Sequence, residues 1–199
     1  MNEIGFLAVP EHSPAAQELF DEDLAELGYV MNVSRLWAYQ PSVVNGLFAL
    51  MKETLSRNKL SLRQRAILVV ACASTLGDSY CSLAWGKKLA AESNDATAAS
   101  LLRGEDQGLS DDERAMAAWA RHVARDPNAT TQADVQALRD VGFSDEQIVA
   151  ITTFVALRLA FSTVNDALGV RPDVELGHSA PVEVVGAITF GRPIADHAG

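Results

Sequence analysis

The stretch Ser61 to Glu92, SLRQRAILVVACASTLGDSYCSLAWGKKLAAE, predicts two consecutive helices with a break at Gly77. Past Arg65 the first helix is apolar almost all round, a pattern typical of a helix buried on every side. The second helix begins after Asp78 and carries Cys81 in its first turn. Unpaired N–H groups and the positive end of the helix dipole lie there, so a thiol at this position tends toward its thiolate. Cys81 is therefore the one candidate nucleophile.

Signals that start and stop helices recur along the chain on both sides of this stretch. Ser13 before Pro14 is an N-cap with proline at the first helical position. Three pairs have the spacing of a capping box, namely Ser61 with Gln64, Ser110 with Glu113 and Ser144 with Gln147. Further helices are expected over residues 41–57, 111–125, 131–139 and 145–168. The sequence predicts an all-α protein in which the 61–76 helix is central and packs against the 145–168 helix.

Length and composition limit the class of protein. A chain of 199 residues with 48% hydrophobic residues can bury one substantial core and does not require a second one. The net charge of −10 argues against nucleic-acid and anionic-membrane partners, which need clustered Lys and Arg. No apolar run approaches a membrane span of roughly 20 residues, and MNEIGFLAVPEHS lacks the features of a signal peptide. We therefore expect a cytoplasmic protein.

The character of the chain changes near its C-terminus. Glycines and prolines there surround a short apolar run, VEVVGAITF, which could form a strand. An isolated strand is unstable without a partner. We expect a helical domain over residues 1–173 and an irregular extension over 174–199 that lies on the core or on a neighbouring subunit.

The remaining cysteine and the histidines give no sign of a disulfide, metal or cofactor. Cys72 lies in the apolar run AILVVACAS and is interpreted as a small buried hydrophobic residue. No histidine has another histidine or a cysteine three or four residues away, so a metal site is not expected, although His122 could approach a pocket; the four are His12, His122, His178 and His197. Nucleotide-binding and nucleophile-elbow motifs are absent from the sequence, so no cofactor is expected either.

The break and its thiol resemble the hairpin of the AhpD-like, or carboxymuconolactone decarboxylase, superfamily, whose peroxidase members read roughly E-(x11)-C-x-Y-C-x-x-x-H. On that pattern Tyr80 and Cys81 match, whereas Ala66, Asp78 and Trp85 stand where the pattern has Glu, Cys and His. The segment LGYVMNVSRLWAYQPSVVNGLFALMKETL resembles the part of those proteins that borders a small-molecule pocket. SDEQIVAITTFVALRLAFSTVNDALGVRPD resembles their closing helix. The resemblance covers roughly residues 27–173 and implies a helical bundle, a small-molecule substrate or ligand, and a homotrimer or homohexamer.

The dithiol cycle that the resemblance implies cannot run on these residues. Asp78 has no sulfur to close a disulfide with Cys81, and neither Trp85 nor Ala66 can relay a proton. Asp78 is instead expected to cap the second helix and to accept from the N–H of Cys81. Its negative charge also raises the pKa of the thiol. Both effects favour Cys81 as a packing residue, but a lone thiolate that an external thiol regenerates stays open.

Three functions therefore remain open. The first is an oxidoreductase whose peroxide or thiol chemistry is confined to Cys81. The second is a lyase or biosynthetic enzyme that uses Asp78 as an acid or base, and the third is a small-molecule binder without catalysis. Tyr80 and Trp85 are candidate pocket residues, although Trp85 is equally compatible with a core position. Further aromatic residues could line the same cavity, namely Trp37, Tyr39 and Phe48.

Overall fold

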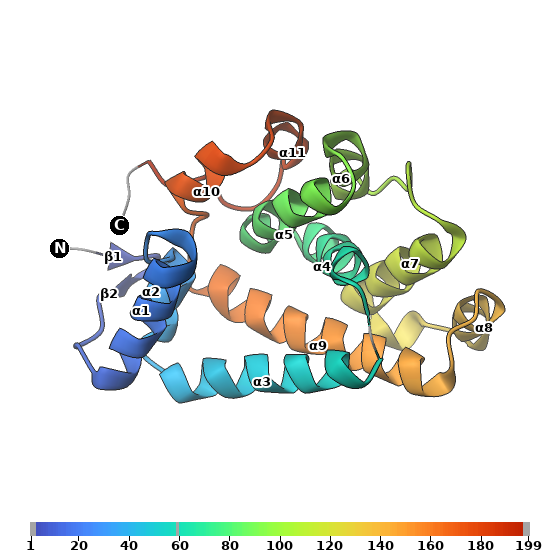
Figure 1. The fold of residues 1–199 in the computed structure, drawn as a ribbon, viewed down its shortest axis with the longest axis horizontal. Coiled ribbons are helices and arrows are strands. Elements are labelled where there is room, and N and C mark those ends of the chain that lie inside the picture. Colours follow the sequence, from blue (N-terminus) through green and yellow to red (C-terminus); the bar gives the residue numbers. More distant parts are fainter. Residues whose placement is uncertain (1–2, 59, 197–199) are drawn as a thin grey trace.

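The protein is a bundle of helices with one short β-hairpin at its N-terminal end (Figure 1). The structure, a computed structural model, describes residues 3–58 and 60–196. The strands β1 (Glu3–Ile4) and β2 (Leu7–Ala8) pair antiparallel, with Glu3 opposite Ala8. The helices are α1 (Pro14–Leu27), α2 (Asn32–Trp37), α3 (Pro41–Asn58), α4 (Leu62–Leu76), α5 (Ser79–Glu92), α6 (Asp95–Leu102), α7 (Asp111–Arg125), α8 (Gln132–Asp140), α9 (Asp145–Ala167), α10 (Val174–Ser179) and α11 (Val182–Ala187), with a 3₁₀ turn at Pro127–Ala129. The prediction of an all-α fold is confirmed.

Helix α4 lies at the centre of the core. Every residue from Ala66 to Ala73 is at most 1% exposed, so the helix is enclosed on all sides. It packs against α5, α7 and α9, which surround it in Figure 1. The apolar pattern of the sequence therefore placed this helix correctly.

The turn that joins α4 to the thiol-bearing helix α5 is fixed by local signals. Gly77 ends α4 with a φ of 86°, a left-handed conformation that residues with a side chain rarely adopt. The N–H of Asp78 donates to the carbonyl of Ala73 at 2.9 Å, which satisfies a free carbonyl of the last turn. At the other end of α4 the capping box is complete, because Gln64 N–H donates to Ser61 Oγ and Ser61 N–H donates to Gln64 Oε1.

Helix α9 lies beside α3 along one side of the bundle (Figure 1). By length and composition it could cross a membrane, which corrects the expectation that no segment approaches that length. It also packs against α4 and α7, and it buries the polar side chains of Arg158 and Asn165 in the protein. Its apolar composition is therefore that of a core helix.

The C-terminal extension lies on the core of its own chain. The run VEVVGAITF does not form a strand, because its first six residues form the helix α11. Together with α10, this helix covers α5 and α6 (Figure 1). Val184 is fully buried there, and a Cβ on Gly86 of α5 would come within 2.9 Å of its side chain. Further on, residues 188–196 are irregular, and Ser79 Oγ donates to the carbonyl of Arg192 at 2.7 Å. The extension thus holds the helix that carries the thiol.

Candidate functional site

Cys81 occupies the third position of α5, where the sequence placed it. The N-cap is Asp78, whose Oδ1 accepts from the N–H of Cys81 at 2.9 Å, so this prediction is confirmed. Both side chains are buried, with Cys81 2% exposed and Asp78 fully enclosed. The cap therefore occupies one N–H group that could otherwise have stabilised a thiolate.

The sulfur has two partners on α9 that sequence reasoning did not find. Arg158 Nη2 donates to Cys81 Sγ at 3.1 Å, and Ser162 Oγ donates to the same sulfur at 3.6 Å. Arg158 is itself only 4% exposed. The sequence did contain one signal for Arg158, because it is the only basic residue in the long apolar helix 145–167.

Burial and charge act in opposite directions on the thiol. Burial raises the pKa of Cys81 well above its usual value, and the carboxylate of Asp78 raises it further. The guanidinium of Arg158 and the hydroxyl of Ser162 lower the pKa and offset part of this rise. Cys81 therefore rests as a neutral thiol, and its thiolate, once formed, has a cation directly beside it.

The thiol borders a small cavity of about 190 Å³ between α2, α3, α5 and α9. Its lining comprises Leu19, Met31, Val33, Ser34, Trp37, Val44, Phe48, Tyr80, Cys81, Ala84, Trp85, Lys88, Arg158 and Phe161. A buried apolar cavity of about 150 Å³ is enough to bind benzene. The cavity by Cys81 is therefore large enough for one small aromatic ring.

Aromatic side chains give the cavity its shape. Trp37 stacks on Phe161 with ring centroids 5.8 Å apart, and its indole N–H donates to Asn165 Oδ1 at 2.9 Å. Trp85 is partly buried, packs against the core and is also among the residues that line the cavity, so it combines the two positions considered for it. Tyr80 lines the cavity too, and its hydroxyl donates to Asp173 Oδ2.

Two residues proposed for the pocket lie elsewhere. Tyr39 is 46% exposed and donates its hydroxyl to the carbonyl of Ala8 at 2.9 Å, so it does not reach the cavity. His122 lies on α7 and pairs with Asp134 of α8 at 3.2 Å, away from the thiol. Both placements depend on how the helices pack, which their own sequence segments do not encode.

The structure holds His12, His178 and Cys72 apart from the cavity. His12 and His178 are exposed, and His197 lies outside the described residues. Cys72 is buried in α4 as predicted, and burial raises the pKa of its thiol to about 12. Across residues 3–58 and 60–196, no group of three His, Cys, Asp or Glu side chains could hold a metal ion.

Asp78 lies outside the lining of the cavity, and its charge acts on a second carboxyl group, that of Asp166. It is not among the residues that line the cavity, and its Oδ2 has no hydrogen-bond partner within the described chain. Burial and the charge of Asp78 raise the pKa of Asp166 to about 7, against the opposing effect of Arg192. Neither carboxyl group lines the cavity, so neither is placed to contact a ligand there.

The raised pKa of Asp166 predicts a dependence of stability on pH. The folded protein favours the protonated form, so its stability is complete below the unfolded-state pKa near 4 and falls as the pH rises through 7. Asp166→Asn, which stays neutral, should unfold at higher temperature than the wild type at pH 8 but not at pH 4.5. Because Asp166 is only partly buried and solvent screens its charge, we expect a gain of only about 1 kcal/mol.

Thermal unfolding at the two pH values measures this effect. Glu18→Gln is the matched control, because it neutralises an exposed carboxylate on α1. If both variants change the unfolding temperature by the same amount, or if the change in Asp166→Asn is the same at both pH values, then the pH dependence of stability does not come from Asp166.

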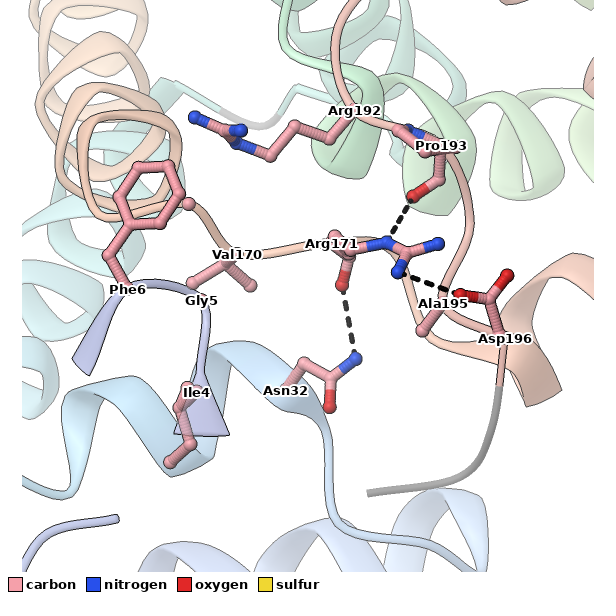
Figure 2. A pocket seen from close by; sticks show the side chains of 11 residues that line it. Ile4, Gly5, Phe6, Asn32, Val170, Arg171, Arg192, Pro193, Ala195 and Asp196 are labelled. Carbon is pink, nitrogen blue, oxygen red and sulfur yellow. Dashed lines mark hydrogen bonds and ion pairs between the residues drawn. The ribbon is translucent and has the colours of Figure 1, made fainter. Parts of the chain in front are cut away.

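A larger cavity of about 540 Å³ lies at the other end of the extension, between β1, α2 and the C-terminal segment (Figure 2). Its two arginines already have partners. Arg171 donates to the carbonyl of Pro193 at 3.1 Å and pairs with Asp196 at 3.0 Å. The side-chain amide of Asn32 donates to the backbone carbonyl of Arg171. Arg192 donates to the carbonyl of Asp166 and lies over the ring of Phe6. This region therefore holds the chain end in place, and its charges are not free for a ligand.

Comparison with known proteins supports the fold. No protein-family model matches the chain, and no curated protein matches it. Among solved structures, an AhpD-core, peroxidase-related protein from Ralstonia eutropha JMP134 is 24% identical, with a TM-score of 0.77 over 88% of this chain and 96% of its own. A peroxidase-related protein from Silicibacter sp. TM1040 is 23% identical, with a TM-score of 0.76 over 88% of this chain and 95% of its own.

A third solved structure has the same fold and a bound ligand. The debrominase Bmp8, in a variant with a cysteine replaced by alanine and in complex with 2,3,4-tribromopyrrole, is 17% identical. Its TM-score is 0.70 over 90% of this chain and 96% of its own. These identities establish the architecture alone, so the chain has the AhpD-like fold, and its chemistry must be argued from the site.

Proposed function

We propose that the protein is an oxidoreductase in which Cys81 reduces a small organic hydroperoxide bound in the 190 Å³ cavity. The observation that carries this proposal is the 3.1 Å contact between Arg158 Nη2 and Cys81 Sγ at the cavity wall. A cation next to the sulfur stabilises the thiolate, which is the form that attacks a peroxide. The reducing conditions of the cytoplasm, the compartment we propose, supply the thiols that such a cycle needs.

The cycle uses one protein sulfur and two external thiols. Cys81 attacks the O–O bond, takes one oxygen as a sulfenic acid and releases the alcohol, which receives the proton. One external thiol then condenses with the sulfenic acid to a mixed disulfide and releases water. The second external thiol then attacks the external sulfur of the mixed disulfide and displaces Cys81, which restores its thiol and leaves a disulfide between the two external thiols. Cys72 is not part of this cycle, because it does not line the cavity.

Arg158 has two tasks in this cycle. It balances the thiolate of Cys81 before the attack, and its positive charge stabilises the alkoxide that forms as the O–O bond breaks. Ser162 offers a second donor to the sulfur from the same helix. The peroxidase-related names of two solved structures with this fold are in line with such chemistry.

Reductive removal of a halogen from an aromatic ring is a second candidate. It is favoured by the aromatic walls of the cavity and by the debrominase with the same fold. In this reaction the carbon–halogen bond breaks, carbon takes a proton, and two external thiols are oxidised to a disulfide as halide is released. The same thiol of Cys81 would carry it out, so halide release distinguishes it from peroxide reduction.

The other functions that the sequence left open have less support. A lyase that uses Asp78 needs this carboxyl group at the ligand, but Asp78 does not line the cavity. A binder without catalysis predicts no turnover at all.

We also propose a homo-oligomer, because α3 exposes Val43 and Leu50, seven residues apart and on one side of the helix. A monomeric mass in solution would contradict this assembly.

The experiment measures oxidation of an external dithiol with cumene hydroperoxide as the substrate. We expect Cys81→Ser to lower the rate at least about 100-fold, because a hydroxyl is a far weaker nucleophile than a thiolate. Cys72→Ser is the matched control, since it removes the other sulfur from a buried position outside the cavity. A dimedone adduct on Cys81 should appear when the external thiol is omitted.

Three outcomes decide between the functions. Equal activity of wild type and Cys81→Ser would exclude both redox candidates. Activity that depends on Asp78 but not on Cys81 would favour the lyase. Saturable binding of an aromatic compound without thiol oxidation or halide release would leave the binder.

A further inference from the structure

The described residues that line the cavity beside Cys81 carry positive charge and no negative charge. Lys88 and Arg158 are among its lining residues, and no Asp or Glu is. An adjoining cavity of about 510 Å³ shares Phe48, Trp85 and Arg158 with it and adds two more cations, Lys52 and Arg65, again without a carboxylate. The whole chain has a net charge of −10, so this local excess of cations runs against its composition.

Lys88 is placed to bind an anion at the wall of the cavity. Its Nζ lies 4.7 Å from the centroid of the Trp85 ring, and it forms no ion pair within residues 3–58 and 60–196. The side chain of Lys88 is exposed overall, but partial desolvation of its amine lowers its pKa, and the charges of Arg158 and Lys87 lower it further, while Glu26 of α1 raises it. An anion bound beside Lys88 would therefore relieve an unfavourable environment.

Arg158 also has capacity for a further partner. Its Nη2 bonds to the sulfur, but its buried Nε has no hydrogen-bond partner in the described structure. The guanidinium lies over the rings of Trp85 and Phe161, at 5.4 and 5.1 Å. A buried donor without a partner is unfavourable unless a bound molecule satisfies it.

From these contacts we infer that the substrate of the Cys81 site is a small aromatic carboxylate. This inference rests on the proposed function and specifies its substrate. The ring lies against Trp37, Trp85 and Phe161, the carboxylate lies at Lys88, and the hydroperoxide group of the same molecule points to Cys81. Arg158 adds a second positive charge along the same cavity wall. A neutral aromatic molecule fills the same space but leaves both cations without an anion.

Binding can be measured on the whole protein through its own tryptophans, because Trp37 and Trp85 both line the cavity. The probes are benzoate and its uncharged counterpart methyl benzoate, which share the same ring. We expect benzoate to quench the tryptophan fluorescence with an affinity at least about tenfold higher, the effect of one charge-assisted contact. The preference should weaken as salt is added.

Variants on α5 identify the group responsible. Lys88→Gln should abolish the preference for benzoate and leave the affinity for methyl benzoate unchanged. Lys87→Gln is the matched control, because Lys87 bonds to Ser179 Oγ at 2.7 Å and does not line the cavity. Equal affinities of wild type for the two probes, an equal loss of both in Lys88→Gln, or no saturable binding of either probe would overturn the inference.

The binding test also separates the inference from the proposed function. Cys81→Ser should keep the preference for benzoate while it loses dithiol oxidation. A preference for benzoate in a protein that never oxidises the dithiol refutes the redox function alone. Cys81-dependent peroxide reduction without any preference for the carboxylate refutes the substrate class alone.

Discussion

Arg158→Met is expected to make Cys81 much less reactive while it leaves the protein folded. Nη2 of Arg158 lies 3.1 Å from the sulfur and lowers the pKa of the thiol against the effect of burial. A cation this close lowers the pKa of an acidic group by about 1 to 3 units, so its loss should reduce the thiolate fraction about 10- to 1,000-fold. The pH dependence of iodoacetamide alkylation, measured in a Cys72→Ser background, gives this change directly.

The same substitution is expected to raise stability. Arg158 is buried, and its Nε has no hydrogen-bond partner in the described structure, so the folded state bears the cost of an incompletely paired charge. Replacement of buried charged groups by apolar ones of similar size is often neutral or stabilises by about 1 to 4 kcal/mol. A residue kept at such a cost is typical of a site selected for function.

Arg158→Lys is the matched control for the charge. It keeps a cation near the sulfur and should retain more of the alkylation rate than methionine does. If Arg158→Met unfolds at a lower temperature and alkylates at the wild-type rate, then Arg158 serves packing and the proposed chemistry loses its main support.

Local signals in the sequence were sufficient to predict the central hairpin. Ser61 and Gln64 fix the start of α4, Gly77 fixes its end, and Asp78 caps α5. Each of these effects acts within a few residues along the chain, so one sequence contains the whole cause. The position of Cys81 in the first turn of α5 followed from the same signals.

Contacts between distant segments could not be predicted in this way. Arg158 and Cys81 are 77 positions apart, and which side of α9 meets the sulfur is decided by packing of the whole helix. The helix that begins in the run VEVVGAITF was not predicted, for a related reason. Its β-branched residues favour a strand, but burial of Val184 between α5 and α6 stabilises a helix in its place. The suggestion that Tyr39 could line the cavity was likewise wrong, because its hydroxyl donates to the carbonyl of Ala8 in the N-terminal hairpin.

Asp173→Ala is expected to destabilise the protein more than any other single change to its hydrogen bonds. Asp173 is 2% exposed and accepts from two donors, the hydroxyl of Tyr80 and the N–H of Asn32, the latter at 2.7 Å. Alanine would leave the hydroxyl of Tyr80 without this partner in the interior, and the N–H of Asn32 without it in a partly buried position. Each buried unsatisfied group costs about 1 to 3 kcal/mol, so we expect a loss of about 4 kcal/mol. For a chain of this size, this corresponds to a fall of roughly 8 to 16 °C in the unfolding temperature.

The substitution should also disturb the cavity, because Asp173 connects the start of the C-terminal extension to two of the cavity walls. Tyr80 lines the cavity from α5, and Asn32 begins α2, which contributes Trp37. Glu175→Ala, two residues further on in α10, is the matched control and should change stability by less than about 0.5 kcal/mol. Tyr80→Phe with Asp173→Ala removes the stranded hydroxyl as well as its acceptor, so it should recover part of the lost stability. A double variant no more stable than Asp173→Ala would show that the hydroxyl of Tyr80 is not what makes the loss large.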